Sequence, residues 1–501
     1  MVGQKLLSAL LKIDPEPVAG SKTGMEVWRL HAELGKQNVV LRVSVRDFWE
    51  RLNAELQNEE LRSRNRVVIG SPGIGKSSTH PYLLRLLLKT GRPVVFLERG
   101  KYREGKYYEF RPNGDGGYEA LEYKEKDVDE DAIPALKNPS AFLLIEPLGN
   151  RTPPNEWIKA IIVLVCSPNL EHYKGMEKSG EQQFDASFRY FPHWSSEEIH
   201  EARPYMQTKQ GKNEKSAEEV EADLDDDIWC LGKFPRGLFS EDRRKYYDER
   251  QNIALNNLSE EQVKRIMGSL GSGSRTLDID GSSPSSPSSA LVEYHVEAPF
   301  VSRPLEIVSG RVAAGIWSRH EQLLLRSVLY EVPAKARYCF EEYCRMLLAK
   351  KEGAAFTIRS RGSKKNSTSP YIPRLKGVQW RIKVVDGELQ DVDLPPRTLY
   401  WARSETQELV DALAKREDGG VDGFQFSLGI KYTCTPSTLR LFASKLGTSE
   451  RPFRLYYMVP EAHFAKFQIT PKTCRVKNAE VYILSCGSEQ LSKFAALDTS
   501  T

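Results

Sequence analysis

One glycine-rich stretch constrains the fold of this chain more than any other. Residues 70–77 read Gly-Ser-Pro-Gly-Ile-Gly-Lys-Ser, an unbroken G-x-x-x-x-G-K-S pattern, between a β-branched run at 67–69 and a leucine-rich run at 82–88. A strand, a loop and a helix in this order form a phosphate-binding loop, because the glycines let backbone N–H groups point inward and the helix offers its positive N-terminal end. The stretch therefore predicts an α/β fold around a nucleotide site.

Each position of this loop has an expected task. Lys76 is expected to reach the β- and γ-phosphates, and Ser77 is expected to hold Mg²⁺. The alternative is a plain glycine turn, which the complete set of fixed positions disfavours. The other expected nucleotide-binding residues are Gly70, Ser71, Pro72, Gly73, Ile74 and Gly75.

Three further apolar runs predict the rest of a parallel sheet, at 93–97, 141–146 and 161–166. They are apolar throughout rather than alternating, as expected of parallel strands that helices cover on both faces. We therefore predict a P-loop NTPase domain over residues 63–268, with a doubly wound, mostly parallel sheet and a helical lid. Ligands of such sheets bind at the carboxyl ends of the strands.

The remaining chain divides around a low-complexity segment. Residues 1–62 form a lead-in with an expected amphipathic helix at the N-terminus, and residues 269–290 form a Ser/Gly/Pro-rich linker. Residues 291–501 are predicted to be an α+β domain. Its expected helices are 334–349 and 436–446, and its expected strands are 355–359, 378–384, 421–426 and 454–459.

Some local elements of the first half also have clear signals. A strand is predicted at 37–45 and a helix at 48–56. The glycine-rich turn at 113–117 predicts a hairpin. Ser195 and Glu198 have the spacing of an N-terminal capping box.

Hydrolysis of a nucleotide needs a carboxylate near Mg²⁺. Glu146 ends a hydrophobic strand and is the candidate for this catalytic and metal-binding role; the alternative is a strand-end glutamate without a metal. Pro147 follows it, so no second carboxylate stands beside Glu146. This absence favours nucleotide binding over rapid turnover.

Two further side chains are candidates for phosphate contact. Ser167 follows a strand and could face the γ-phosphate, while Ser167 to Asn169 also has the composition of a simple turn. Arg236 could neutralise developing phosphate charge, or it could pair with the acidic run Asp225–Asp227. The sequence leaves both pairs of alternatives open.

Composition gives only general bounds. The net charge is +4, so overall charge does not demand a polyanionic partner. The seven cysteines form no metal-binding spacing, which favours a reducing compartment without structural zinc. No signal h-region and no run of ~18 apolar residues is present, so neither conventional export nor a membrane span is expected.

A mixture of cations and aromatic residues in the second half suits nucleic acid. The basic loop 359–365 is followed by Arg374, Lys376, Trp380, Arg381 and Lys383. Such a mixture can contact phosphates and stack on bases. The alternative is a solvated loop.

Several phrases together resemble one family. They are the loop at 70–77, Cys-Ser-Pro-Asn at 166–169, Tyr-Phe-Pro-His-Trp-Ser at 190–195 and Leu-Gly-Lys-Phe-Pro-Arg-Gly-Leu-Phe at 231–239. This combination resembles the Crinkler and retrotransposon hot spot (RHS) proteins. Members pair a P-loop NTPase of AAA+/STAND type with a C-terminal restriction-endonuclease-like domain. The resemblance covers nearly the whole chain from residue 38 onward.

The resemblance implies roles for residues in the first half. Arg236 corresponds to a sensor-2-like arginine, and Ser167 lies at a sensor-1-like position. The chain departs from the family pattern at Glu146, which replaces an aspartate, and at Lys233, where the family often has glycine.

The resemblance also implies a Mg²⁺-dependent, nuclease-like site in the tail. Glu341 would come from a helix, Asp411 from a strand and Gln425 from the next strand, with Asp422 as an alternative to Asp411. The usual lysine of such sites is absent, since position 427 is serine and the nearest lysine is Lys431. Metal binding is therefore better supported than catalysis.

The implied ligands and partners are ATP, Mg²⁺ and DNA. The leading hypothesis is a nucleotide-dependent switch that governs a DNA-binding, nuclease-like tail; the alternative is an effector or regulator that cleaves nothing. RHS-type members reside in the nucleus of the cell that makes them, and Crinkler-type members are secreted and act in a host nucleus on host proteins. An oligomer is compatible with either type.

Overall fold

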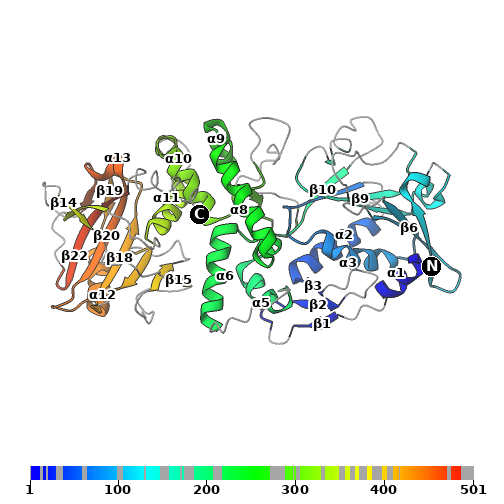
Figure 1. The fold of residues 1–501 in the computed structure, drawn as a ribbon, viewed down its shortest axis with the longest axis horizontal. Coiled ribbons are helices and arrows are strands. Elements are labelled where there is room, and N and C mark those ends of the chain that lie inside the picture. The colour runs from blue at the N-terminus through cyan, green and yellow to red at the C-terminus, as the bar shows by residue number, and fades with distance from the viewer. Residues whose placement is uncertain are drawn as a thin grey trace. The chain divides into compact units, whose positions relative to one another are not determined.

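The structure of the protein is a computed structural model. The chain forms two compact units, the first comprising Met1–Glu214 and Leu231–Val308 and the second Lys215–Cys230 and Ser309–Thr501. Figure 1 colours them along the chain. The residues that the structure describes are 2–11, 15–18, 21–29, 38–58, 65–98, 105–128, 131–146, 157–169, 172–173, 176, 186–206, 217–270, 288–296, 298–300, 305–328, 333–348, 356–360, 367–371, 381–385, 398–402, 410–416, 418–470 and 476–486.

A seven-stranded sheet forms the centre of the first unit. Its strands lie in the order β10, β4, β9, β8, β5, β6, β7. The first five pair in parallel, and β6 and β7 extend the sheet as an antiparallel hairpin. The bounds are β10 (Ala186–Tyr190), β4 (Asn65–Ile69), β9 (Ile161–Cys166), β8 (Phe142–Ile145), β5 (Val94–Glu98), β6 (Lys106–Pro112) and β7 (Tyr118–Lys124).

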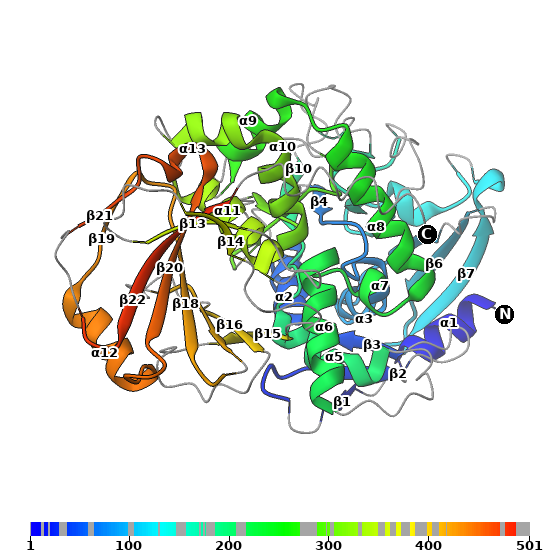
Figure 2. The same cartoon turned by 60° about the vertical axis from the view of Figure 1, so that its left-hand side comes forward.

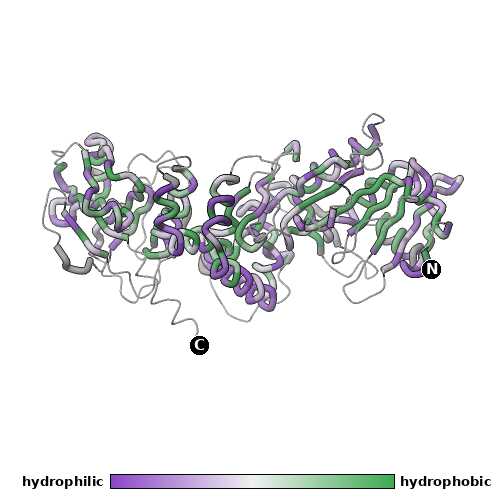
Figure 3. The backbone as a smooth tube through the Cα atoms, turned by 90° about the horizontal axis from the view of Figure 1, so that it is seen from above, coloured by the Kyte–Doolittle hydropathy of each residue, from purple (hydrophilic) through white to green (hydrophobic). Residues whose placement is uncertain are grey.

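The apolar runs in the sequence become the buried strands of this sheet. Every residue of β4, β8 and β9 is buried, as predicted for strands covered on both faces. Neighbouring green segments in the part of Figure 3 near the N-terminus show the same hydropathy. The predicted mixed α/β fold with a mostly parallel sheet is thus confirmed.

The predicted hairpin is β6 and β7, which lie side by side in Figure 2. The side chain of Asn113 accepts a hydrogen bond from Gly117 N at 2.7 Å and closes the turn. The N-terminal helix α1 (Val2–Leu11) packs beside β7 and buries Leu6, Leu7 and Leu10.

The lead-in differs from the prediction at one boundary. Its three antiparallel strands are β1 (Pro15–Pro17), β2 (Glu26–Arg29) and β3 (Asn38–Leu41), and helix α2 begins at Val43. The predicted strand to residue 45 is therefore too long. Val45, Phe48, Trp49, Leu52 and Leu56 are buried at helical spacing, so packing of α2 (Val43–Gln57) overrides the strand preference of its valines.

Further helices of the first unit follow the loop at 70–77. A 3-10 turn (Ser77–Thr79) leads into α3 (His80–Leu88). The later helices are α5 (Ser196–Met206), α7 (Pro235–Leu238), α8 (Glu241–Asn256) and α9 (Glu260–Ser269). A short pair, β11 (Val292–Tyr294) and β12 (Leu305–Ile307), completes this unit.

A buried ion pair ties the lead-in to α5. Arg42 is 1% exposed, and its Nη1 donates to Glu198 Oε2 at 2.8 Å. Its Nη2 donates to the carbonyl of Pro192 at 2.8 Å, and its guanidinium lies 4.4 Å from the ring centre of Trp194. Glu198 also accepts from Ser195 N at 2.9 Å, which confirms the predicted capping box.

The second unit is built on an eight-stranded mixed sheet, in the order β14, β13, β22, β20, β18, β17, β16, β15. The bounds are β14 (Ser367–Tyr371), β13 (Phe356–Ser360), β22 (Ala479–Cys486), β20 (Phe453–Pro460), β18 (Val421–Phe426), β17 (Ala412–Lys415), β16 (Thr398–Ala402) and β15 (Arg381–Val385). Strands β19 (Lys431–Thr433) and β21 (Gln468–Thr470) form a separate pair. The helices are α6 (Ala217–Leu231), α10 (Gly310–Val328), α11 (Pro333–Leu348), α12 (Pro436–Leu446) and α13 (Glu461–Phe464).

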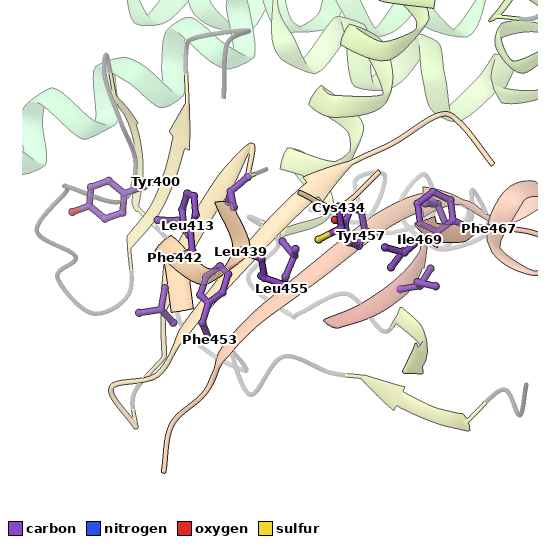
Figure 4. Close-up of a cluster of buried hydrophobic side chains, with 14 of the residues drawn as sticks. Tyr400, Leu413, Cys434, Leu439, Phe442, Phe453, Leu455, Tyr457, Phe467 and Ile469 are labelled. Atoms are coloured by element: carbon purple, nitrogen blue, oxygen red, sulfur yellow. The ribbon is translucent and has the colours of Figure 1, made fainter. Parts of the chain in front are cut away.

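One face of this sheet packs on α12. Phe442 of α12 stacks on Phe453 of β20 with 5.6 Å between ring centres, and Leu439 and Leu455 lie beside them (Figure 4). The predicted helix 436–446 and strand 421–426 have the bounds of α12 and β18. Most of the linker, 271–287, lies outside the described residues.

Helix α6 belongs to the second unit by its contacts. Trp229 Nε1 donates to Glu342 Oε2 of α11 at 2.6 Å, and Arg345 lies 5.6 Å from the centre of the Trp229 ring. The helix therefore packs on α11 although it precedes the linker in the sequence.

We predict that Arg42→Met lowers the free energy of unfolding of the first unit by about 3–5 kcal/mol, because Glu198 stays buried without its cation. The matched control is Arg46→Met, which removes a partly exposed pair with Glu26 and should cost about 1 kcal/mol or less. Urea unfolding of both variants measures the difference. Equal losses would contradict a special role for the buried pair.

Candidate functional site

The glycines of the loop have the backbone conformations that this segment requires. Gly73 and Gly75 have φ angles of 86° and 99°, in the left-handed region that favours glycine. Gly70 has no room for a side chain, because an added Cβ would lie 2.9 Å from the Cβ of Phe191. The loop starts directly after β4, an inner strand of the sheet, at the carboxyl end of the parallel strands.

Lys76 is buried and its ammonium group binds its own loop. Nζ donates to the carbonyl oxygens of Gly70 at 2.5 Å and Ser71 at 2.9 Å. Burial lowers the pKa of Lys76 to about 8. Lys76 thus bonds to two loop carbonyls, and the negative charge of Glu146 partly offsets the effect of burial on its pKa.

Ser77 and Glu146 come together as the sequence predicted. Glu146 follows β8 directly, and its Oε1 accepts a hydrogen bond from Ser77 Oγ. The other oxygen, Oε2, lies 3.8 Å from His80 Nδ1. Burial lowers the pKa of His80, so this imidazole is neutral near pH 7. A hydroxyl and a carboxylate in contact beside a lysine are groups that can hold Mg²⁺ next to a phosphate.

Three side chains that the sequence analysis did not assign support the loop from outside. Trp194 Nε1 donates to the carbonyl of Ile74 at 2.9 Å, and the Tyr247 hydroxyl donates to the carbonyl of Pro72 at 3.4 Å. Trp49 Nε1 donates to Thr79 Oγ1 at 3.0 Å, just after the loop. The only sequence signal among them is Trp194, which belongs to the Phe-Pro-x-Trp-Ser phrase.

The other two candidates of this site lie near the loop. Ser167 follows Cys166, whose carbonyl accepts a hydrogen bond from Gly70 N at 3.3 Å. The hydroxyl of Ser167 lies 2.9 Å from His172 Nδ1. Arg236 is exposed on α7, and its Cβ would lie 3.4 Å from a Cβ added to Gly73. Arg236 makes no ion pair with the described residues of its unit.

In the second unit the three predicted residues gather at one place. Asp411 immediately precedes β17, and its Oδ2 accepts from Gln425 Nε2 at 2.6 Å and from Phe426 N at 2.7 Å. Gln425 is 2% exposed, and its Oε1 is buried without a hydrogen-bond partner among the described residues. Glu341 of α11 contributes to the electrostatic environment of Asp411.

An arginine joins the two carboxylates of this cluster. Arg337 Nε donates to Glu341 Oε1 at 2.5 Å, and its Nη2 lies 3.6 Å from Asp411 Oδ1. Arg337 is not among the residues predicted from the sequence, although it stands four residues before Glu341, the spacing of a helical ion pair.

The carboxyl of Asp411 has an unusually high pKa, and burial is the main cause. It raises the pKa of Asp411 to about 7; the charge of Glu341 adds to the rise, while Phe426 N, Arg337 and Gln425 oppose it. A buried carboxylate that resists ionisation gains from a cation that enters beside it.

The chemical types of the three predicted ligands suit a hard cation. Glu341, Asp411 and Gln425 Oε1 are oxygen donors of the type that Mg²⁺ prefers, and Oε1 lacks any other partner in the described structure. Among the described residues, no group of three or more His, Cys, Asp or Glu side chains could hold a metal ion.

The structure distinguishes Asp422 from Asp411 by its contacts. Asp422 binds Arg416 at 2.6 Å and lies three positions before Gln425 on β18, on the opposite face of the strand. Lys431 is exposed on β19, and Ser427 follows β18. Residues 361–365, Arg374, Lys376 and Trp380 lie outside the described residues.

No protein-family model, curated protein or solved structure matches this chain. Of the helices described, none is long and apolar enough to cross a membrane.

We predict that Asp411→Asn changes how stability depends on pH in the presence of a chelator. The carboxyl of Asp411 binds its proton more tightly in the folded than in the unfolded chain, so the wild type loses stability as pH rises from about 4 to about 7. The asparagine variant should lack this loss, which is on the order of a few kcal/mol.

Urea unfolding of the second unit between pH 4 and 7.5 measures the two slopes. Glu450→Gln, which changes an exposed glutamate, is the control and should run parallel to the wild type. Parallel slopes for Asp411→Asn and the wild type would show that Asp411 titrates normally.

Proposed function

We propose that the first unit binds ATP with Mg²⁺ and acts as a nucleotide-dependent switch. The observation that carries this proposal is the contact between Ser77 and Glu146 beside the buried Lys76. The glycine conformations of the loop and its place after β4, an inner parallel strand, support the same function. ATP is favoured over GTP because the sequence has no N-K-x-D guanine-reading motif.

The roles of the side chains follow from their chemistry. Lys76 would exchange its hydrogen bonds to Gly70 and Ser71 for bonds to phosphate oxygens. Ser77 and Glu146 would hold Mg²⁺, whose charge offsets that of the phosphates. Arg236 and Ser167 are proposed as further phosphate contacts. A single carboxylate supports binding with slow hydrolysis rather than rapid turnover.

Lys76→Ala should abolish ATP binding, because it removes the buried cation of the loop. Isothermal titration with ATP and Mg²⁺ provides the measurement, and Lys89→Ala, an exposed lysine after α3, is the matched control. Unchanged ATP affinity in Lys76→Ala would refute the proposed nucleotide site.

We propose that the second unit is a nucleic-acid-binding, nuclease-like unit with Glu341, Asp411 and Gln425 as Mg²⁺ ligands. Gln425 supports this proposal, because its Nε2 donates to Asp411 while its buried Oε1 has no partner among the described residues. When bound, the cation would stabilise negative charge on a phosphodiester. The alternative is a unit that binds nucleic acid without cutting it, which the missing lysine favours.

Asp411→Ala combined with Gln425→Ala should abolish Mg²⁺-dependent cleavage of DNA by the full-length protein, because it removes two of the three metal ligands. Gel analysis of DNA after incubation with ATP and Mg²⁺ measures the loss, with Glu450→Ala as the control. Absence of cleavage by the wild type with every metal tested would favour the non-catalytic alternative.

We propose, from the sequence phrases, that the chain is a member of the Crinkler and RHS group and acts in a nucleus. One of those phrases contains Trp194, which binds the loop carbonyl of Ile74. Fractionation of producing and recipient cells distinguishes a resident nuclear protein from a secreted effector that reaches a host nucleus. Its presence in neither nucleus would contradict the proposal.

A further inference from the structure

Arg337 lies beside the two carboxylates of the second unit, Glu341 and Asp411, whose negative charges favour a neighbouring cation. Its guanidinium contacts Glu341 at 2.5 Å and approaches Asp411 at 3.6 Å, so one positive group serves two negative ones. The side chain of Arg337 is 50% exposed, whereas those of Glu341 and Asp411 are 24% and 15% exposed. The guanidinium of Arg337 is therefore the most accessible group of the cluster, and the two carboxylates are more buried.

This arrangement leaves one acceptor unused. Gln425 donates through Nε2 to Asp411, but its Oε1 is buried without a partner among the described residues. The guanidinium bonds to Glu341 and does not serve this oxygen. A small divalent cation can bind carboxylate and amide oxygens together, so it would satisfy all three residues where Arg337 satisfies two.

We propose that Arg337 is a built-in competitor of the metal ion: its guanidinium occupies the carboxylates of Glu341 and Asp411, and the metal can bind only when this side chain leaves. The inference rests on the proposed metal site of the second unit. It assigns to Arg337 a positioning role in the metal-free protein and a gating role in metal entry.

The competition has a thermodynamic consequence. Metal can bind only to the molecules in which Arg337 has left the carboxylates. The apparent metal affinity therefore equals the intrinsic affinity multiplied by the fraction of such molecules. Arg337 also prevents repulsion between Glu341 and Asp411 when no metal is bound. Removal of the guanidinium should therefore strengthen metal binding and weaken the metal-free fold, two effects of opposite sign from one substitution.

The experiment is titration of the full-length, metal-free protein with Mn²⁺, followed by electron paramagnetic resonance of the unbound ion, without nucleotide or nucleic acid. Arg337→Ala should bind Mn²⁺ on the order of tenfold more tightly than the wild type, since two partly exposed ion pairs together are worth about that factor. Asp411→Asn should lose binding at this site.

Two further variants make the result specific. Arg440→Ala removes an exposed arginine from α12 and changes the net charge equally, so it should bind Mn²⁺ like the wild type. Arg337→Gln keeps much of the side-chain length without the charge and should behave like Arg337→Ala, which provides a second test if the alanine variant does not fold.

The outcomes separate the inference from the function on which it rests. If both Arg337 variants bind Mn²⁺ no more tightly than the wild type while Asp411→Asn loses binding, the metal site stands and the competition is refuted. If the wild type and both Arg337 variants bind no Mn²⁺ at this site, the proposed metal site itself fails. A lower melting temperature of metal-free Arg337→Ala that excess Mn²⁺ restores would support the competition.

Discussion

The first unit depends on satisfying the backbone of an irregular loop. Carbonyl groups outside helices and strands still need donors when they are buried. Ile74 receives its donor from Trp194, 120 residues away, and Pro72 receives its donor from Tyr247, 175 residues away. The loop therefore takes its shape only when the sheet, the segment before α5 and helix α8 have all assembled around it. The proposed nucleotide site would therefore be a property of the whole unit rather than of one local motif.

In the second unit, buried polar groups also depend on partners from distant parts of the chain, but their hydrogen bonding is less complete. Asp411 obtains its donors from Gln425 and Phe426 of the neighbouring strand, and Arg337 supplies charge from α11. Gln425 Oε1 remains without a partner in the described structure. A buried unpaired acceptor is costly, so a cation that bound this oxygen would stabilise the unit. In both units, then, the candidate site lies where the fold gathers polar groups that the local sequence cannot satisfy.

Much of the fold was predictable because it depends on local patterns. Strand β18 and helix α12 were predicted with their observed bounds, and Glu146 was predicted at the end of β8. The start of α2 was wrong because packing of Val45 outweighed its strand preference. Trp49 and Tyr247 could not be predicted as loop supports, since no spacing rule joins residues so far apart. Arg337 could have been found from its helical spacing to Glu341.

Helix α6 has a consequence for how the protein can be divided. The chain passes between the units after Glu214, after Cys230 and after Val308. A fragment that ends at Val308 keeps α6 but loses Glu342, the partner of Trp229, and a fragment that begins at Ser309 lacks α6 altogether. No single cleavage therefore yields two intact halves. Each unit is compact in space but is built from two separate stretches of the sequence. The second unit can therefore be isolated whole only if residues 215–230 are supplied as a joined or separate segment.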